Sequence, residues 1–254
     1  MENEKNENSE KISKTKSVLL LCCILISLAL LSLLASSWYE RQAIKTIRIS
    51  GNTVLTAGEV YAIIDKKIMN IPNKGIKLNE IKEMLVANEY VADANVWFNS
   101  RGVLGIEIKE RVPVGIVVNP DASIAFVDQT GTIFQYRLYK EYTDLPVISN
   151  VYNRIKQINN VSLLGALDIV TMLQSGFPKL NNIVSEVRFN PVTNGYELYL
   201  TEANIKVDFG KPENIAQKLE KIYTFWREKI SLVPDKKQFR NIDVKWNNIV
   251  IVKR

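Results

Sequence analysis

Residues 91–98 read VADANVWF, the next four read NSRG, and residues 103–113 read VLGIEIKERVP. Apolar and polar residues alternate in both longer segments, with the period of two that is typical of strands with one buried face. The face predicted to be buried carries Ala92, Ala94, Val96, Phe98, Leu104, Ile106 and Ile108. The polar turn between the segments returns the chain, so this stretch is predicted to form a β-hairpin.

The residues before the hairpin predict one strand and two helices. Residues 44–50 alternate like a strand and end at a Gly-Asn turn. Thr56 and Glu59 fit a capping box at the start of a short helix. Leucine and isoleucine recur at helical spacing over 78–85, so a second helix is expected to run to about residue 88. Residues 44–112 are thus predicted to form strand, helix, helix, strand, strand, with both helices on one face of a small mixed sheet.

Beyond Pro113 the sequence predicts a larger α+β domain with a mostly antiparallel sheet. Helices are expected near 162–174 and from 214 to about 229, where apolar residues recur on one face. The predicted strands are 116–118, 124–127, 132–137, 183–190, 196–201, 205–209, 242–246 and 249–252. Pro113 is the expected junction, which divides the chain into domains at 40–113 and 114–254.

An uncharged run extends from Ser17 to Tyr39. As a helix it would span about 34 Å, enough to cross a hydrocarbon core of about 30 Å. Trp38 and Tyr39 end the run where aromatic side chains favour the headgroup boundary. A cleavable signal peptide is the alternative, because residues 35–37 are small, but its apolar region is usually shorter. A retained transmembrane helix is therefore predicted over 17–39.

The segment before this helix, residues 1–16, holds four Glu and four Lys with little apolar content. Such a composition is typical of disorder, and we predict a cytoplasmic tail. A short tail before one helix and a long domain after it favour an orientation that exports the domain. The exported part has no cysteine, while Cys22 and Cys23 lie within the predicted membrane helix.

The composition excludes several kinds of enzyme. The 254 residues include no histidine and two cysteines, which rules out Ser–His–Asp and Cys–His nucleophile systems and zinc sites built from His and Cys. No phosphate-binding glycine motif occurs, and the carboxylates are scattered. The formal charge is +6, but aromatic residues do not interleave with the basic ones as in nucleic-acid binders. No catalytic, cofactor-binding or metal-binding residue is predicted.

The end of the chain is the most informative candidate for binding. Residues 249–252 read IVIV and would be apolar on both faces of a strand. Such a strand can be central and buried, or it can lie at an edge and offer backbone hydrogen bonds to a partner. Lys253 and Arg254 follow, and at an edge they would discourage indiscriminate pairing and attract an acidic partner.

Several stretches of the sequence resemble the FtsQ/DivIB family of cell-division proteins. Those similar to a POTRA domain are the strand at 44–50 with its Gly-Asn turn, VADANV at 91–96 and IEIKERVP at 106–113. Those similar to the C-terminal part of the family are FVDQTGTIF at 126–134, DLPVI at 144–148 and NIDVKW at 241–246. The sequence departs from the pattern at Asn150, where the family often has glycine. The given sequence also ends directly after the last predicted strand, without the long extension of many DivIB proteins.

The resemblance implies a single-pass inner-membrane protein of the divisome, without enzymatic activity. Its N-terminus would be cytoplasmic and its main domain periplasmic, at the division septum. The implied partners are FtsB-like and FtsL-like proteins, with further septal proteins at the POTRA domain, and no cofactor, nucleic acid or small-molecule substrate. In the family the last strands accept a strand from FtsB, which by position assigns partner binding to Trp246, Ile249, Val250, Ile251, Val252 and Lys253.

Two other functions stay open on the sequence. A POTRA-containing secretion or outer-membrane assembly factor would be expected to carry an attached barrel or several POTRA copies, and one copy is visible. A cell-wall enzyme with a carboxylate pair would be expected to turn over peptidoglycan and to lose that activity when one Asp or Glu is changed.

Overall fold

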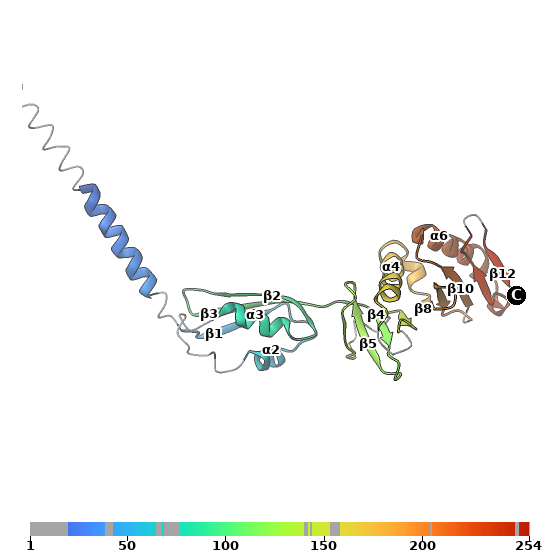
Figure 1. Cartoon of the computed structure of the whole chain (residues 1–254), viewed down its shortest axis with the longest axis horizontal. Coiled ribbons are helices and arrows are strands. Elements are labelled where there is room, and N and C mark those ends of the chain that lie inside the picture. The colour runs from blue at the N-terminus through green and yellow to red at the C-terminus, as the bar shows by residue number, and fades with distance from the viewer. Residues whose placement is uncertain are drawn as a thin grey trace, which may run out of the picture. The chain divides into compact units, whose positions relative to one another are not determined.

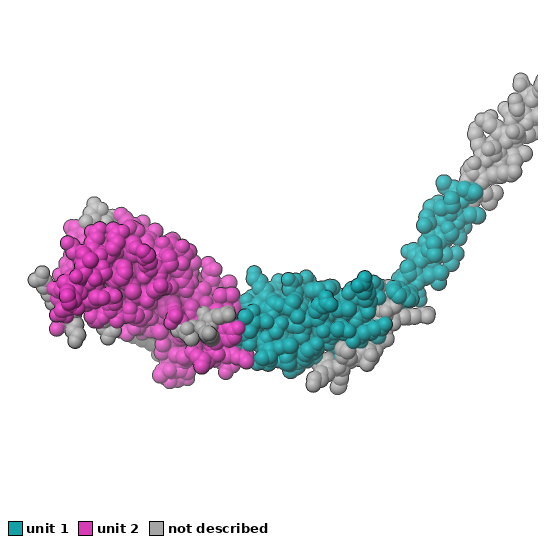
Figure 2. Space-filling view, turned by 180° about the vertical axis from the view of Figure 1, so that it is seen from behind, with its two compact units in different colours: residues 1–110 teal, residues 111–254 magenta. Residues whose placement is uncertain are grey.

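The computed structural model describes residues 20–38, 43–64, 68, 77–139, 142, 144–152, 158–203, 205–246 and 249–253. The chain divides into two compact units, residues 1–110 and residues 111–254, which Figure 2 shows in different colours. The tail predicted at 1–16 lies outside the described residues.

The first described element is a helix over Leu20–Trp38, drawn in blue in Figure 1. Within the described part of the chain, it is the one helix that is long and apolar enough to cross a membrane. Cys22 and Cys23 are free and exposed on it. The remaining ends of the predicted span, 17–19 and 39, lie outside the described residues.

The first unit also holds a small sheet and two helices: β1 (Thr46–Ser50), α2 (Ala57–Ile63), α3 (Leu78–Val86), β2 (Val91–Phe98) and β3 (Val103–Glu110). The strand order is β1-β3-β2, with β1 parallel to β3 and β2 antiparallel to it. This arrangement confirms the predicted order of elements and the mixed sheet.

One detail of the predicted hairpin is wrong. The register of β2 against β3 shifts between Val91 and Asp93. Such a bulge adds one residue to a strand and so moves the alternation by one position. Val91 is consequently fully buried, whereas Ala92, which was expected on the buried face, is partly exposed.

Two side-chain interactions fix the loop that leads into α2. The Thr56 hydroxyl accepts a hydrogen bond from the backbone N–H of Glu59, and the Glu59 carboxylate accepts one from the backbone N–H of Thr56. This is the predicted capping box. At the end of β3, the Glu110 carboxylate accepts hydrogen bonds from the backbone N–H groups of residues 53–55, at 2.9, 2.8 and 2.7 Å.

Within the described residues of the second unit, nine strands form one sheet. They are β4 (Pro113–Val118), β5 (Ile124–Asp128), β6 (Ile133–Gln135), β7 (Val147–Ser149), β8 (Val184–Asn190), β9 (Gly195–Leu200), β10 (Ile205–Gly210), β11 (Asn241–Asp243) and β12 (Ile251–Lys253). Their order is β12-β11-β10-β9-β8-β7-β4-β5-β6. Five neighbouring pairs are antiparallel and three are parallel, so the sheet is mixed and mostly antiparallel.

The described part of the second unit contains the helices α4 (Asn160–Gly176), α5 (Pro178–Asn181) and α6 (Ile215–Phe225). α6 continues into the π-helical turn η4 (Trp226–Ile230), and a short 3-10 helix, η5, spans Lys236–Gln238. α4 contacts β4, β8 and α6 (Figure 1). Gly165 of α4 allows close packing on the sheet, since a Cβ there would lie 2.2 Å from the Tyr196 hydroxyl oxygen. That hydroxyl donates to the carbonyl of Ser162 at 2.8 Å, and burial raises the pKa of Tyr196 to about 12.

The chain turns directly after β7 at Asn150, the position where the resembled family often has glycine. Asn150 has a φ of 61°, in the left-handed region that asparagine tolerates better than most residues. Its side-chain amide also donates to the carbonyl of Phe189 at 2.7 Å. Asparagine therefore makes this turn without glycine.

Candidate functional site

The strand β12 lies at one end of the nine-strand order and pairs antiparallel with β11. Three residue pairs form this contact, Asn241 with Lys253, Ile242 with Val252 and Asp243 with Ile251. No other strand pairs with β12 among the residues that the structure describes. Of the two arrangements that the sequence allowed, the terminal strand is thus at an edge, where its outer backbone groups can accept a further strand.

The two faces of β12 differ in their surroundings. Val252 ends a row of directly opposed residues on the face that packs on the helices, and that row comprises Val187, Leu198, Val207, Ile242 and Val252. Val250 packs against the same core. Ile251, by contrast, is 43% exposed on the opposite face. The strand therefore begins at Ile251, within the IVIV stretch rather than at its start, and it presents isoleucine to solvent on the face opposite the core.

The other predicted partner-binding residues lie on the same segment. Trp246, in the connection from β11, is 59% exposed, and Ile249 is 60% exposed. Lys253 lies in β12 opposite Asn241. Of the six predicted residues, the structure thus places Ile251, Val252 and Lys253 in the edge strand, while Ile249 and Val250 directly precede it and Trp246 lies in the connection.

A hollow of about 270 Å³ lies between this segment and the helix layer. It is lined by Glu220, Lys221, Thr224, Phe225, Glu228, Lys229 and Val250. No pattern in the sequence pointed to the helical residues in this set. The spacing of apolar residues in α6 located its buried face, but it carries no information on which polar residues meet the terminal strand.

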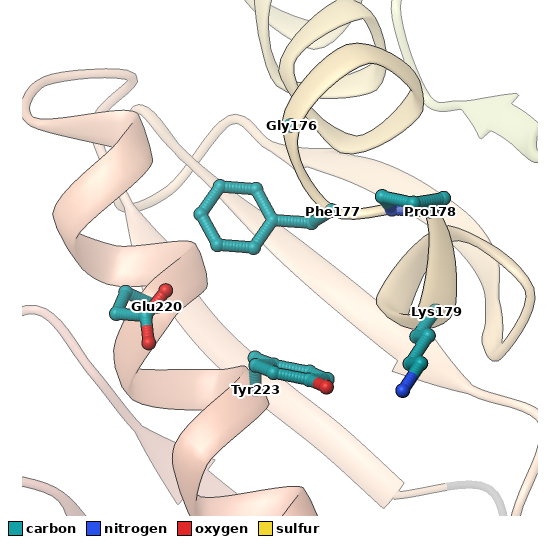
Figure 3. A pocket seen from close by; sticks show the side chains of 6 residues that line it. All are labelled: Gly176, Phe177, Pro178, Lys179, Glu220 and Tyr223. Atoms are coloured by element: carbon teal, nitrogen blue, oxygen red, sulfur yellow. The ribbon is translucent and has the colours of Figure 1, made fainter.

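A second hollow, of about 250 Å³, lies on the other side of α6, at the corner between α4 and α5. Figure 3 shows the rings of Phe177 and Tyr223 at this hollow, with Lys179 beside Tyr223 and Glu220 on the far side. The Tyr223 ring stacks on Trp226, with their centroids 6.1 Å apart. Glu220 lines both hollows, so α6 is the wall that separates them.

The connection between β11 and β12 is held from both faces of the sheet. On the helix face, the Lys221 ammonium donates to the carbonyls of Val244 and Trp246, at 3.2 and 2.7 Å. On the other face, the Lys245 ammonium lies 3.2 Å from the Asp243 carboxylate and 3.5 Å from that of Asp208. Burial lowers the pKa of Lys245, but the two carboxylates outweigh that effect and raise it above its usual value.

The middle of the sheet face opposite the helices is polar, and its side chains hydrogen-bond to one another. The Glu197 carboxylate accepts hydrogen bonds from Asn190, Lys206 and Tyr199, at 3.0, 3.0 and 3.1 Å. Burial raises the pKa of Glu197, yet these hydrogen bonds outweigh it and hold the pKa below the usual range. The exposed apolar side chains therefore lie beside this network, at the edge strand.

Comparisons with known proteins match both units. A family model described as FtsQ/DivIB, C-terminal related, matches residues 112–252, and one described as POTRA domain, FtsQ-type, matches residues 42–111. The chain is also similar to the cell division protein DivIB of Clostridium tetani (strain Massachusetts / E88). The two are 22% identical over 185 residues, which cover 70% of this chain and 68% of that protein. The C-terminal match includes every residue of the candidate edge except Lys253.

Proposed function

Because the chain belongs to the FtsQ/DivIB family of cell-division proteins, we propose that it is a non-enzymatic, membrane-anchored scaffold of the divisome. It links and regulates septal peptidoglycan synthesis through FtsB-like and FtsL-like partners. In this proposal residues 17–39 anchor the chain in the inner membrane, residues 1–16 are cytoplasmic, and the domains at 40–113 and 114–254 lie outside the cytoplasm at the septum.

The observation that carries the proposal is the position of β12 at the edge of the nine-stranded sheet. A partner strand that adds to such an edge gains affinity from backbone hydrogen bonds and specificity from alternate side chains. Ile249 and Ile251 supply exposed apolar contacts for those side chains. The positive charges of Lys253 and Arg254 favour a partner segment with acidic residues.

Deletion of residues 249–254 from the full-length chain tests this site. The deletion removes the edge strand, so we expect capture of a co-expressed FtsB-like partner to be lost. Hydrogen exchange in β8, β9 and β10 reports whether the rest of the sheet remains folded. Undiminished capture by a deletion variant with an intact sheet would contradict the assignment of the site.

The proposed role in cell division is tested by the location of the protein in dividing cells. A fluorescent fusion of the full chain is expected to form a ring at midcell in dividing cells. A uniform signal around the envelope would weigh against a divisome scaffold even if the edge strand bound a partner in vitro.

A further inference from the structure

We propose that Lys221 of α6 is the positioning residue that orders the edge strand for its partner. This inference rests on the proposed function, since it concerns how the same edge is made ready to bind. The strand β12 is weakly held in the sheet, because it contacts a single neighbouring strand through three residue pairs. Short strands with a single neighbour are marginal by themselves, so something else must fix the approach to β12.

The contacts of Lys221 meet that requirement. One ammonium group donates to two carbonyls of the connection, at 3.2 Å to Val244 and 2.7 Å to Trp246. The helix around Lys221 is itself fixed, because Leu219 and Ile222 are 0% and 1% exposed in the core. Lys221 therefore ties the segment that leads into β12 to the rigid helix layer.

The consequence for binding follows from conformational entropy. A partner strand can pair only with an extended, ordered β12, and a disordered one would lose its backbone freedom on binding. Ordering the strand beforehand removes that loss from the association equilibrium and raises the affinity. Lys221 contributes in this way whether or not it touches the partner.

Two other lysines of the same helical segment supply comparisons. Lys218 also donates to a backbone carbonyl, that of Lys211 at 2.7 Å, but Lys211 precedes α6 and is far in sequence from the edge strand. Lys229 is exposed and lines the same hollow as Lys221 and Val250. Substitution of Lys229 thus removes a positive charge from the hollow without breaking the two contacts to the connection.

The experiment uses the full-length chain in detergent, first without any partner. Lys221→Met keeps the apolar stem and removes the ammonium, and we expect hydrogen exchange over 249–253 to become about tenfold faster. Exchange in β9 should stay unchanged, which shows that the sheet is folded. Lys221→Arg, which can still donate to both carbonyls, should restore slow exchange, and Lys229→Met should leave it unaffected.

The second measurement is the affinity of the same variants for the FtsB-like partner. We expect Lys221→Met to weaken binding by about tenfold and Lys229→Met to leave it unchanged. Unchanged exchange over 249–253 in Lys221→Met would overturn the role of Lys221, whatever happens to binding. Faster exchange with full affinity would instead overturn the edge strand as the partner site, so the two proposals fail in different ways.

Discussion

The two edges of the nine-stranded sheet are both strands of three residues, yet their side chains differ sharply. At β6, Phe134 is 3% exposed and its ring contacts Phe126, which also contacts Tyr136 and Tyr142. At β12, Ile251 is 43% exposed, and Trp246 and Ile249 beside it are more exposed still. Two strands at the edges of one sheet can therefore differ in how much apolar surface they present to a partner. We call the β6 edge closed because the Phe134 side chain packs among aromatic rings, and the β12 edge open because the Ile251 side chain is exposed.

The largest effect is expected from breaking the closed edge at Phe126. This residue is 2% exposed and contacts three other rings, with centroid distances of 5.6, 4.9 and 6.1 Å. Phe126→Ala removes all three contacts and leaves a cavity, which should lower the free energy of unfolding by about 3–5 kcal/mol. Denaturant unfolding of the full chain measures the loss. Partner capture at the other edge should persist under native conditions; its loss would mean that the two edges are coupled.

A smaller effect is expected at Asp128, which shapes the turn between β5 and β6. Its carboxylate accepts hydrogen bonds from the backbone N–H groups of Thr130 and Thr132, and from Arg111 at 2.8 Å. Burial raises the pKa of Asp128, but these hydrogen bonds and one from the Thr130 hydroxyl outweigh it and hold the pKa below its usual value. Asp128→Asn weakens them, so we expect a loss of about 2 kcal/mol at neutral pH.

Because the pKa of Asp128 is lowered in the folded protein, the free energy of unfolding is expected to depend on pH. Because the folded-state pKa is depressed, the contribution to stability is complete above the unfolded pKa and is lost as the pH falls through the folded pKa. The unfolding free energy of the wild type should therefore fall more steeply below about pH 4 than that of Asp128→Asn. Parallel pH profiles of the two proteins would contradict this account of the closed edge.

At the open edge the expected effect is on binding and hardly on stability. Ile251→Glu places a charge on an exposed position of β12, so the free energy of unfolding should change by less than about 0.5 kcal/mol. Capture of the partner should weaken by about tenfold or more, because a charge replaces an apolar contact. Val192→Glu is the control, since Val192 is 92% exposed in the turn between β8 and β9 and should alter neither quantity. Equal effects of the two substitutions would remove the distinction of the open edge.

The difference between the edges could be predicted from the sequence only in part. Local signals were enough for the Thr56–Glu59 capping box, for the hairpin and for an apolar terminal strand. Whether that strand was central or at an edge depends on pairing between segments far apart in the chain, such as β10 with β11 across α6. The strand β7 was missed because its place depends on pairing with β4 and β8, which lie far from it in the chain.

Side-chain contacts between residues far apart in the chain could not be predicted from the sequence either. Lys221 reaches carbonyls 23 and 25 residues further along the chain, and no spacing rule connects these positions. The bulge in β2 shifted the buried face by one residue, although the alternation of apolar and polar residues shows no sign of it. The missed features thus share one cause: each depends on which segments meet in the fold.

The smallest effect is expected between the two edges, at Asn150. Asn150→Gly removes the hydrogen bond to the carbonyl of Phe189 but relieves the cost of a positive φ, so the two terms oppose each other. We expect the free energy of unfolding to change by less than about 1 kcal/mol. Asn150→Ala loses the hydrogen bond and keeps the unfavourable φ, so it should be the more destabilising of the two by about 1 kcal/mol. Denaturant unfolding of both variants measures the difference, and an equal loss in each would mean that the turn does not constrain the backbone at this position.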